Sequence, residues 1–149
     1  LVLVCENISD PGNLGTMLRT AEAAGADAVV LAGNTVDLYN PKTVRSTMGS
    51  IFRMPVFSGY EYIELLKKAG FTLVVTCLDG AINLYETDKK DRKIAVVIGS
   101  EAHGVSDALI QKADLKIKIP MSGRVESLNA AIAASVCLYE YRRRFDFES

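Results

Sequence analysis

Short apolar segments recur along the chain, and each is shorter than a typical helix. Residues 1–5 (LVLVC) and 94–98 (IAVVI) contain no charged side chain, and residues 28–31 (AVVL) repeat the pattern. A strand that is covered on both faces has an unbroken apolar run, whereas a strand with one face in water alternates. Because helical patterns separate these runs, the sequence predicts an α/β domain in which a mostly parallel sheet is flanked by helices.

The expected elements follow one another closely, as they do in a compact domain. A chain of 149 residues has the size of one domain, so we assign residues 1–149 to a single unit. The predicted strands are residues 1–5, 28–31, 55–57, 71–77, 94–98 and 115–119. The predicted helices are residues 14–24, 60–69, 106–113 and 125–145, and one that begins at Pro41, in which Val44, Met48, Ile51 and Phe52 recur at helical spacing.

The cysteines indicate a reducing environment. Cys5, Cys77 and Cys137 each lie in an apolar run, and their odd number and wide spacing suit neither a disulfide framework nor a metal site. We therefore expect buried thiols and a cytoplasmic protein. No apolar stretch reaches the length of a membrane span, and no segment has the layout of a signal peptide, so no membrane partner is expected.

The overall charge does not by itself indicate a nucleic-acid partner. The formal net charge is −1 and the pI is about 5.9, whereas phosphate binding normally draws on a basic surface. An RNA partner would need local basic clusters, a groove between two copies or a further domain. The chain starts on an apolar strand at Leu1 rather than with a methionine, which we take as the mark of a fragment.

Three loops that follow predicted strands are rich in glycine and polar residues, namely residues 7–15, 99–106 and 120–129. In open α/β sheets ligands bind at the carboxyl ends of the strands, so we expect the site there. Residues 99–104 (GSEAHG) match neither the dinucleotide-binding fingerprint nor the P-loop. One histidine and scattered carboxylates form no metal-ligand set, so no metal is predicted.

These loops carry three ordered motifs: residues 6–21 (ENISDPGNLGTMLRTA), 98–105 (IGSEAHGV) and 119–129 (IPMSGRVESLN). They resemble the signature motifs of the SpoU/TrmH class of RNA 2′-O-methyltransferases, in the SPOUT superfamily, and residues 48–56 (MGSIFRMPV) also resemble that class. The resemblance covers the whole chain. It implies an α/β knot fold with a C-terminal trefoil knot, which is an exception to the rule that chains do not knot.

The resemblance implies an enzyme that transfers a methyl group from S-adenosylmethionine to a ribose 2′-hydroxyl, without a metal. It also implies a homodimer and an N-terminal RNA-recognition domain outside this chain. Ribosomal RNA is the first expectation for the substrate and transfer RNA the second. Two alternatives remain open: an inactive RNA-binding relative that acts in ribosome assembly, and methylation of a base rather than a ribose.

Five residues are implied to lie at the reacting centre: Asn13, Arg19, Glu101, Ser127 and Asn129. Asn13 could equally cap the helix that starts at residue 14, and Ser127 and Asn129 could cap the last helix. In this class the arginine is held to deprotonate the hydroxyl. A guanidinium is a poor base, so binding of a substrate phosphate by Arg19 is the easier role.

The resemblance also implies ligand contacts. The residues expected to bind S-adenosylmethionine are Thr76, Cys77, Leu78, Ile98, Gly99, Glu101, Gly104, Ile119, Met121, Ser127 and Leu128. The residues expected to bind RNA are Arg19, Lys42, Arg45 and Arg53. His103 is not expected to act in catalysis. Residues 142–144 (RRR) are interpreted first as a solvated helix end and second as an RNA contact.

Overall fold

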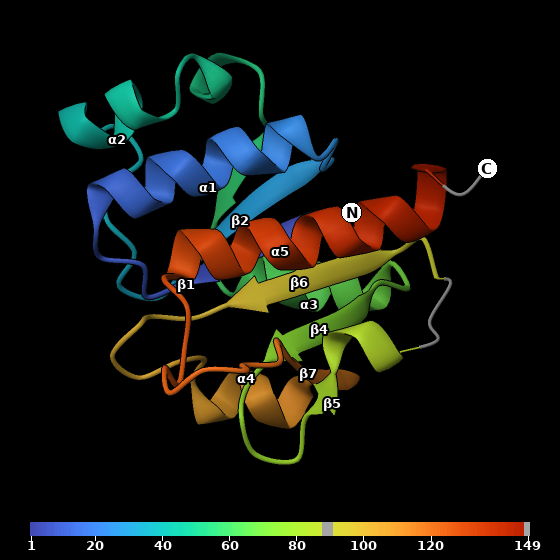
Figure 1. Cartoon of the computed structure of the whole chain (residues 1–149). Helices are drawn as coiled ribbons and strands as arrows, with labels where there is room; N and C mark the ends of the chain where they lie inside the picture. The colour runs from blue at the N-terminus through green and yellow to red at the C-terminus, as the bar shows by residue number, and fades with distance from the viewer. Residues whose placement is uncertain (88–90, 148–149) are drawn as a thin grey trace.

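The computed structural model of the chain describes residues 1–87 and 91–147. Its described strands form one seven-stranded sheet in the order β3-β2-β1-β6-β4-β7-β5, and every pair is parallel (Figure 1). The strands are β1 (Val2–Glu6), β2 (Ala28–Ala32), β3 (Val56–Ser58), β4 (Thr72–Thr76), β5 (Ile82–Asn83), β6 (Ile94–Ile98) and β7 (Leu115–Lys118). The predicted parallel sheet is confirmed. Sequence reasoning missed β5, because two residues carry no readable periodicity.

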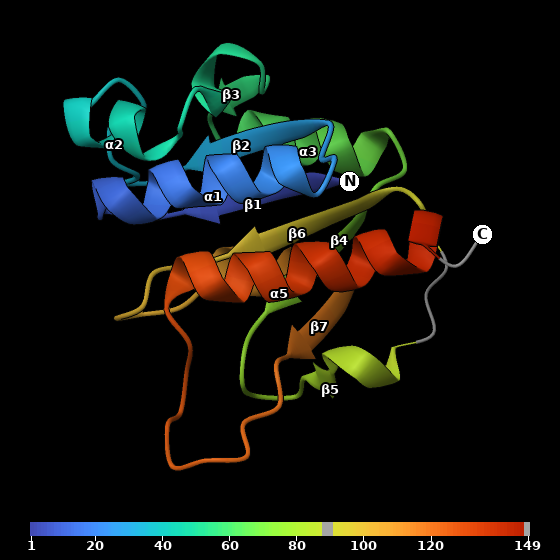
Figure 2. The same cartoon turned by 45° about the horizontal axis from the view of Figure 1, so that its top comes forward.

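Helices cover both faces of this sheet. They are α1 (Pro11–Ala23), α2 (Pro41–Ser46), α3 (Glu61–Lys68), α4 (Asp107–Lys112) and α5 (Ala130–Arg142). Successive strand residues point to opposite faces, so Leu3 and Cys5 join the core beneath α1 and α5, whereas Val2 and Val4 join the core beneath α3 and α4. Figure 2 shows α1 and α5 side by side, with their N-terminal ends at the same edge. The flanked sheet is therefore the predicted α/β architecture.

The helix predicted from Pro41 and the last helix differ most from their predicted bounds. The pattern from Val44 to Phe52 does not form one helix, because α2 ends at Ser46 and the backbone turns left-handed at Met48 (φ 50°) and Gly49 (φ 89°). A short 3-10 helix, Ser50–Phe52, follows, and the Phe52 side chain is 86% exposed. Helix α5 begins at Ala130 rather than at residue 125, because the Asn129 side chain caps its first turn and the residues before it form a loop.

Helix α1 starts three residues earlier than predicted. Asp10 is its N-cap and accepts a hydrogen bond from the Asn13 backbone nitrogen at 2.9 Å, and Pro11 occupies the first turn. The interpretation of Asn13 as the cap is therefore wrong. Because Asp10 caps the helix, the Asn13 side chain can form hydrogen bonds outside α1.

Arg142 and Arg144, near the C-terminus, bind backbone carbonyls of other segments. Arg142 donates from Nε to the Ala24 carbonyl and from Nη2 to the Gly25 carbonyl, both at 2.7 Å. These carbonyls lie at the C-terminal end of α1, where a cation offsets the partial negative charge of the helix. The solvated-end interpretation is therefore wrong for Arg142.

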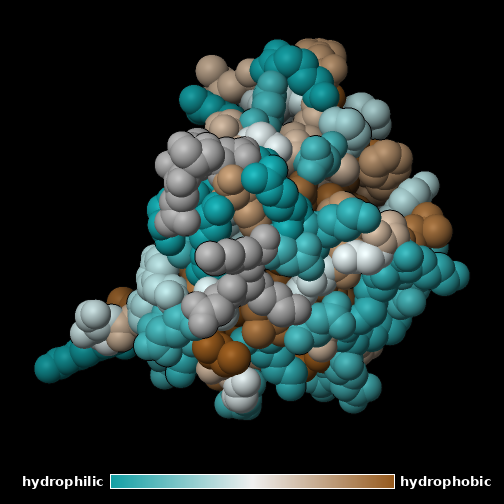
Figure 3. Space-filling view, turned by 90° about the vertical axis from the view of Figure 1, so that its right-hand side faces the viewer, coloured by the Kyte–Doolittle hydropathy of each residue, from teal (hydrophilic) through white to brown (hydrophobic). Residues whose placement is uncertain are grey.

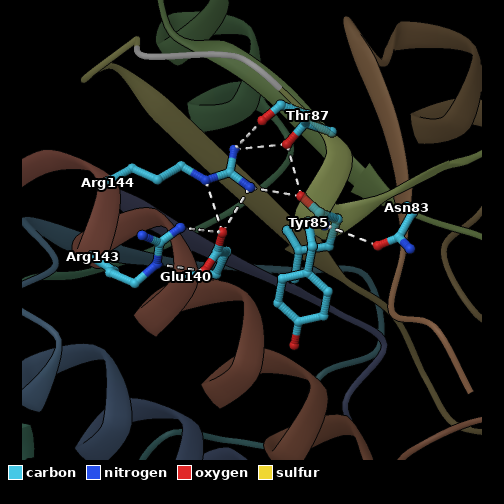
Figure 4. A network of polar contacts seen from close by, with 7 residues as sticks. Asn83, Tyr85, Thr87, Glu140, Arg143 and Arg144 are labelled. Carbon is cyan, nitrogen blue, oxygen red and sulfur yellow. Dashed lines mark hydrogen bonds and ion pairs between the residues drawn. The ribbon is translucent and has the colours of Figure 1, made fainter.

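Arg144 joins the end of α5 to the segment after β5, as Figure 4 shows. Its Nη1 donates to the Thr87 carbonyl and hydroxyl, at 2.9 and 2.7 Å, and its Nη2 donates to the Leu84 carbonyl at 2.6 Å. Its Nε donates to Glu140 at 3.0 Å, and Arg143 binds the same carboxylate. The Arg144 side chain is 9% exposed, so these contacts hold a largely buried guanidinium.

The side of the molecule in Figure 3, on the right in Figure 1, is mainly hydrophilic, and its apolar atoms lie in small separate groups. The strand arrows in Figure 1 point away from this side. The carboxyl ends of the strands therefore lie at the opposite edge.

No described helix combines the length and the apolar character that crossing a membrane requires.

Gly15 lets α1 approach α2 closely. A Cβ at this position would lie 2.4 Å from the Ser46 Cβ and 2.6 Å from the Thr43 carbonyl oxygen. At an open helix position, replacing glycine by alanine raises the free energy of unfolding by about 1 kcal/mol. Here the added methyl group has no room, so Gly15→Ala should instead lower the free energy of unfolding by about 1–3 kcal/mol through overpacking. Urea denaturation measures the change. Gly123→Ala is the control, because a Cβ there meets nothing within 4 Å, and an equal effect of both changes would contradict the prediction.

Because of Glu140, the free energy of unfolding should fall as the pH becomes acidic. Hydrogen bonds from Arg143, and then from Arg144, hold its pKa below the usual value. Its contribution is therefore complete above the pKa of the unfolded carboxyl and is lost as pH falls through the lower folded pKa. Glu140→Gln should cost about 2 kcal/mol of unfolding free energy near neutral pH and little at about pH 3. Urea denaturation at both pH values tests this, and a cost independent of pH would contradict it.

Candidate active site

A cavity of about 630 Å³ lies at the carboxyl ends of β4, β6 and β7. This volume is in the range of about 300–1,000 Å³ that small-molecule sites occupy. All the residues expected to bind a cofactor lie in its wall: Thr76, Cys77, Leu78, Ile98, Gly99, Glu101, Gly104, Ile119, Met121, Ser127 and Leu128. Three segments far apart in the sequence thus meet in one cavity, since parallel strands end at the same edge.

The wall combines apolar and charged groups. Ile98 is buried, and Ile119 and Leu128 are half-buried. Five charged residues that sequence reasoning did not select also line the cavity: Asp79, Asp107, Lys116, Lys118 and Glu126. Lys116 and Lys118 are two residues apart on β7, so their side chains lie on the same face of the sheet. This spacing was the sequence signal that could have identified them.

The cysteines differ in their burial. Cys5 and Cys137 are buried as predicted, and desolvation raises the pKa of Cys137 to about 12. Cys77 is only half-buried and lines the cavity, so the expectation of three buried thiols is wrong for this residue. Desolvation also raises the pKa of Cys77, which keeps it a neutral thiol and a poor nucleophile.

Three side chains from separate elements meet at the rim of the cavity. Oε1 of Glu101, in the loop after β6, accepts hydrogen bonds from Asn129 Nδ2 at 2.9 Å and from Asn13 Nδ2 at 3.3 Å. It also accepts from the Ala130 backbone nitrogen at 3.3 Å, and Asn129 Nδ2 donates to Asn13 Oδ1 at 3.1 Å. We call Asn13, Glu101 and Asn129 the rim cluster.

Asn129 has two roles at once. Its Oδ1 accepts hydrogen bonds from the backbone nitrogens of Ala131 and Ile132, so it is the N-cap of α5. The same amide presents its nitrogen to Glu101. The predicted capping by Asn129 is confirmed, whereas Ser127 is not the cap.

The loop that carries Glu101 is closed at its base by two glycines. A Cβ on Gly99 would lie 2.2 Å from the Gly104 carbonyl carbon, so only glycine allows this approach. The Gly104 nitrogen donates to the Ser100 carbonyl at 2.8 Å, and Gly104 has φ +67°. This tight turn directs Glu101 toward α1 and α5.

Other predicted residues lie apart from the rim cluster. Ser127 lines the cavity but forms none of the hydrogen bonds of the cluster. Arg19 is exposed on α1, six residues after Asn13, and belongs to neither the described cavity wall nor the cluster. His103 is exposed in the cavity wall.

The predicted RNA-binding residues occupy the region around α2. Lys42 and Arg45 are exposed on this helix, which packs beside α1. Lys42 reaches toward the first turn of α1, where its Cε lies 3.6 Å from the position of a Cβ on Gly12. Arg53 forms an ion pair with Glu22, and this pairing raises the pKa of Arg53 and lowers the pKa of Glu22. The charge of Arg53 is therefore already engaged within the chain.

Sequence reasoning assigned no role to Glu6, the last residue of β1. Its side chain is fully buried and accepts three hydrogen bonds, from Tyr60 and from the backbone and hydroxyl of Ser106. A carboxylate that ends an apolar strand was the available signal, because a buried charge needs partners.

The described residues contain no group of three or more His, Cys, Asp or Glu side chains placed to hold a metal ion. The rim cluster consists of one carboxylate and two amides. These groups can accept and donate hydrogen bonds to a substrate.

The rim cluster predicts a specific coupling. Asn129→Asp keeps an oxygen for the helix cap but turns its second oxygen toward Glu101 Oε1 and Asn13 Oδ1. We expect lower stability in the native background and recovery in a Glu101→Gln background, because the glutamine amide can donate to the new carboxylate. A double-mutant cycle by urea denaturation measures this coupling, which for contacting residues is about 0.5–3 kcal/mol. Additive effects would rule out the contact.

Known proteins resemble the chain in both sequence and structure. The SpoU rRNA Methylase family model matches residues 1–139. The chain is 43% identical over 143 residues to the 23S rRNA (guanosine(2553)-2′-O)-methyltransferase RlmP of Bacillus subtilis strain 168, a match that covers 95% of this chain and 57% of that protein. The chain therefore spans little more than half of this relative.

Two solved structures have the same fold. The AdoMet-bound rRNA methyltransferase from Sinorhizobium meliloti has a TM-score of 0.89 at 38% identity, over 95% of this chain and 55% of that one. The SpoU methyltransferase AviRb from Streptomyces viridochromogenes, in complex with AdoMet, has a TM-score of 0.87 at 35% identity, over 97% of this chain and 60% of that one. With a family match over almost its whole length, this chain belongs to the SpoU rRNA methylase family.

Proposed function

We propose that this chain is the catalytic domain of an RNA methyltransferase, which transfers a methyl group from S-adenosylmethionine to a ribose 2′-hydroxyl of ribosomal RNA. One observation carries the proposal: Glu101 belongs both to the cavity wall and to the rim cluster. A small molecule in the cavity and a substrate at the rim would therefore meet at one carboxylate. The names of the similar proteins support the same activity.

The cavity suits S-adenosylmethionine in size and in chemistry. Ile98, Ile119, Met121 and Leu128 offer apolar surface and backbone groups for a purine, as in most nucleoside sites. Residues 76–78 and Ser127 supply further polar atoms to the wall. When bound, the cofactor supplies a methyl group on a sulfonium, which is already a good leaving group.

The rim cluster would orient the methyl acceptor. Three donors hold Glu101 Oε1, whereas Oε2 takes part in no hydrogen bond among the described residues. Oε2 is thus available to accept a hydrogen bond from the ribose hydroxyl and to direct its oxygen toward the cavity. Asn13 and Asn129 keep the carboxylate in place, which is how positioning contributes to catalysis.

Arg19 would bind the phosphate beside the reacting ribose. It is exposed, and a guanidinium binds phosphate through two parallel hydrogen bonds. Lys42 and Arg45 on the neighbouring α2 extend this positive surface. Such a local cluster supports RNA binding although the net charge of the chain is −1.

We further propose a cytoplasmic homodimer that forms through the outer face of α5. Ile132 and Tyr139, two turns apart on that helix, are 53% and 43% exposed. Apolar side chains in this arrangement suit a helix-to-helix contact. The trefoil knot and an N-terminal RNA-recognition domain also stay predictions from the family.

Calorimetry and methyl transfer test the function. The whole purified protein should bind S-adenosylmethionine and transfer labelled methyl groups to ribosomal RNA. Arg19→Ala should lower kcat/KM for RNA by about 10²-fold, as loss of a positioning group does, and should leave cofactor binding intact. A protein that binds no S-adenosylmethionine would rule out the proposal.

The alternatives give different outcomes in the same assay. Binding without transfer to any cellular RNA would indicate an inactive relative, and label only in transfer RNA would change the substrate. Alkaline hydrolysis of the product separates ribose from base methylation, because a 2′-O-methyl group protects the adjacent phosphodiester. Normal cleavage at the labelled nucleotide would exclude the ribose.

A further inference from the structure

The Glu6 carboxylate lies at the carboxyl end of β1 and is hydrogen-bonded to Ser106, the last residue of the loop that carries Glu101. Its side chain has no exposed surface, and a buried carboxylate is costly unless several donors satisfy it. Oε1 accepts from the Ser106 backbone nitrogen at 2.7 Å. Oε2 accepts from the Ser106 hydroxyl and from the Tyr60 hydroxyl, both at 2.7 Å. These short contacts involve an ionic acceptor, so they are stronger than neutral hydrogen bonds.

The Tyr60 hydroxyl stays protonated and therefore remains a hydrogen-bond donor to Glu6. Desolvation, and then its hydrogen bond to Glu6, raise the pKa of the Tyr60 hydroxyl to about 12. Tyr60 therefore keeps its proton at neutral pH. It approaches Glu6 from the start of α3, whereas Ser106 approaches from the start of α4. Glu6 thus joins three elements on the side of the sheet opposite the rim cluster.

Ser106 is the point at which the Glu101 loop rejoins the fold. The preceding residue, Val105, is buried, and its nitrogen lies 2.3 Å from the position of a Cβ on Gly99. The loop is therefore closed at its base, and a shift of Ser106 would move both Gly99 and Gly104. Both glycines and Glu101 line the cavity, whereas Glu6, Tyr60 and Ser106 do not.

We infer that Glu6 is a positioning residue, which holds the loop of residues 99–106 in the conformation that binds the cofactor, through its hydrogen bonds to Ser106. The inference rests on the proposed binding of S-adenosylmethionine. It gives a role to the buried Glu6 carboxylate, which neither lines the cavity nor belongs to the rim cluster. Loss of these bonds would weaken cofactor binding although no atom that touches the cofactor changes.

Three variants test this in the whole purified protein, with the Kd of S-adenosylmethionine measured by calorimetry. Ser106→Ala removes one hydrogen bond to Glu6 and should raise the Kd about tenfold. Tyr60→Phe removes a bond to the same carboxylate from another element, and should raise the Kd about threefold. Because Tyr60 has no part in the cap of α4, its effect separates the carboxylate from helix capping.

Glu6→Gln is the conservative variant. Its amide oxygen can still accept from the Ser106 nitrogen, and its NH₂ can donate to the two hydroxyls, which rotate to accept. We expect a Kd within about twofold of the native value. Thr72→Val is the matched control, because it removes a side-chain hydrogen bond to Asp91 from a buried threonine at the opposite edge of the sheet. This control should lower Tm and leave the Kd unchanged.

The outcomes separate this inference from the proposed function. Native protein that binds no S-adenosylmethionine would overturn the proposed function itself. Native binding with an unchanged Kd in both Ser106→Ala and Tyr60→Phe would overturn only the role of Glu6. A Kd that rises as much in Thr72→Val as in Ser106→Ala would show a general loss of stability, and would also overturn that role.

Discussion

The structure depends on the complete burial of its two central strands. Every residue of β1 and β6 is buried, because α1 and α5 cover one face of the sheet and α3 and α4 cover the other. Such strands cannot carry unpaired polar side chains along their length. The polar groups are therefore placed at the carboxyl ends, where Glu6 ends β1 and the Glu101 loop follows β6. Since the strands are parallel, these ends meet at one edge.

Helix α5 is attached to α1 at both ends and in the middle. Asn129 at its start bonds Asn13, the Ser135 hydroxyl bonds that of Thr20 at 3.3 Å, and Arg142 at its end bonds the last carbonyls of α1. The two helices run in the same direction (Figure 2), so their starts lie together at the rim of the cavity. Arg142 and Asn129 thus attach opposite ends of α5 to α1.

Much of the fold and the cavity could be predicted. The unbroken apolar runs of β1 and β6 indicate strands that are buried on both faces, and burial on both faces is typical of a parallel α/β sheet. Because these strands are parallel, the loops after β4, β6 and β7 lie at one edge, and the predicted cofactor residues line one cavity there. The family motifs named Asn13, Glu101 and Asn129, but only the distances show that they form one cluster.

The sequence alone determined the kind of sheet and the edge that bears the site, because both follow from local periodicity and from the chain direction of parallel strands. Only the tertiary structure decided which residue caps α1, that Arg142 and Arg144 bind carbonyls, and that Glu6 accepts bonds from Tyr60 and Ser106. The partners of Glu6 lie 54 and 100 residues away along the chain. A polar side chain has many such candidates, and packing alone selects among them.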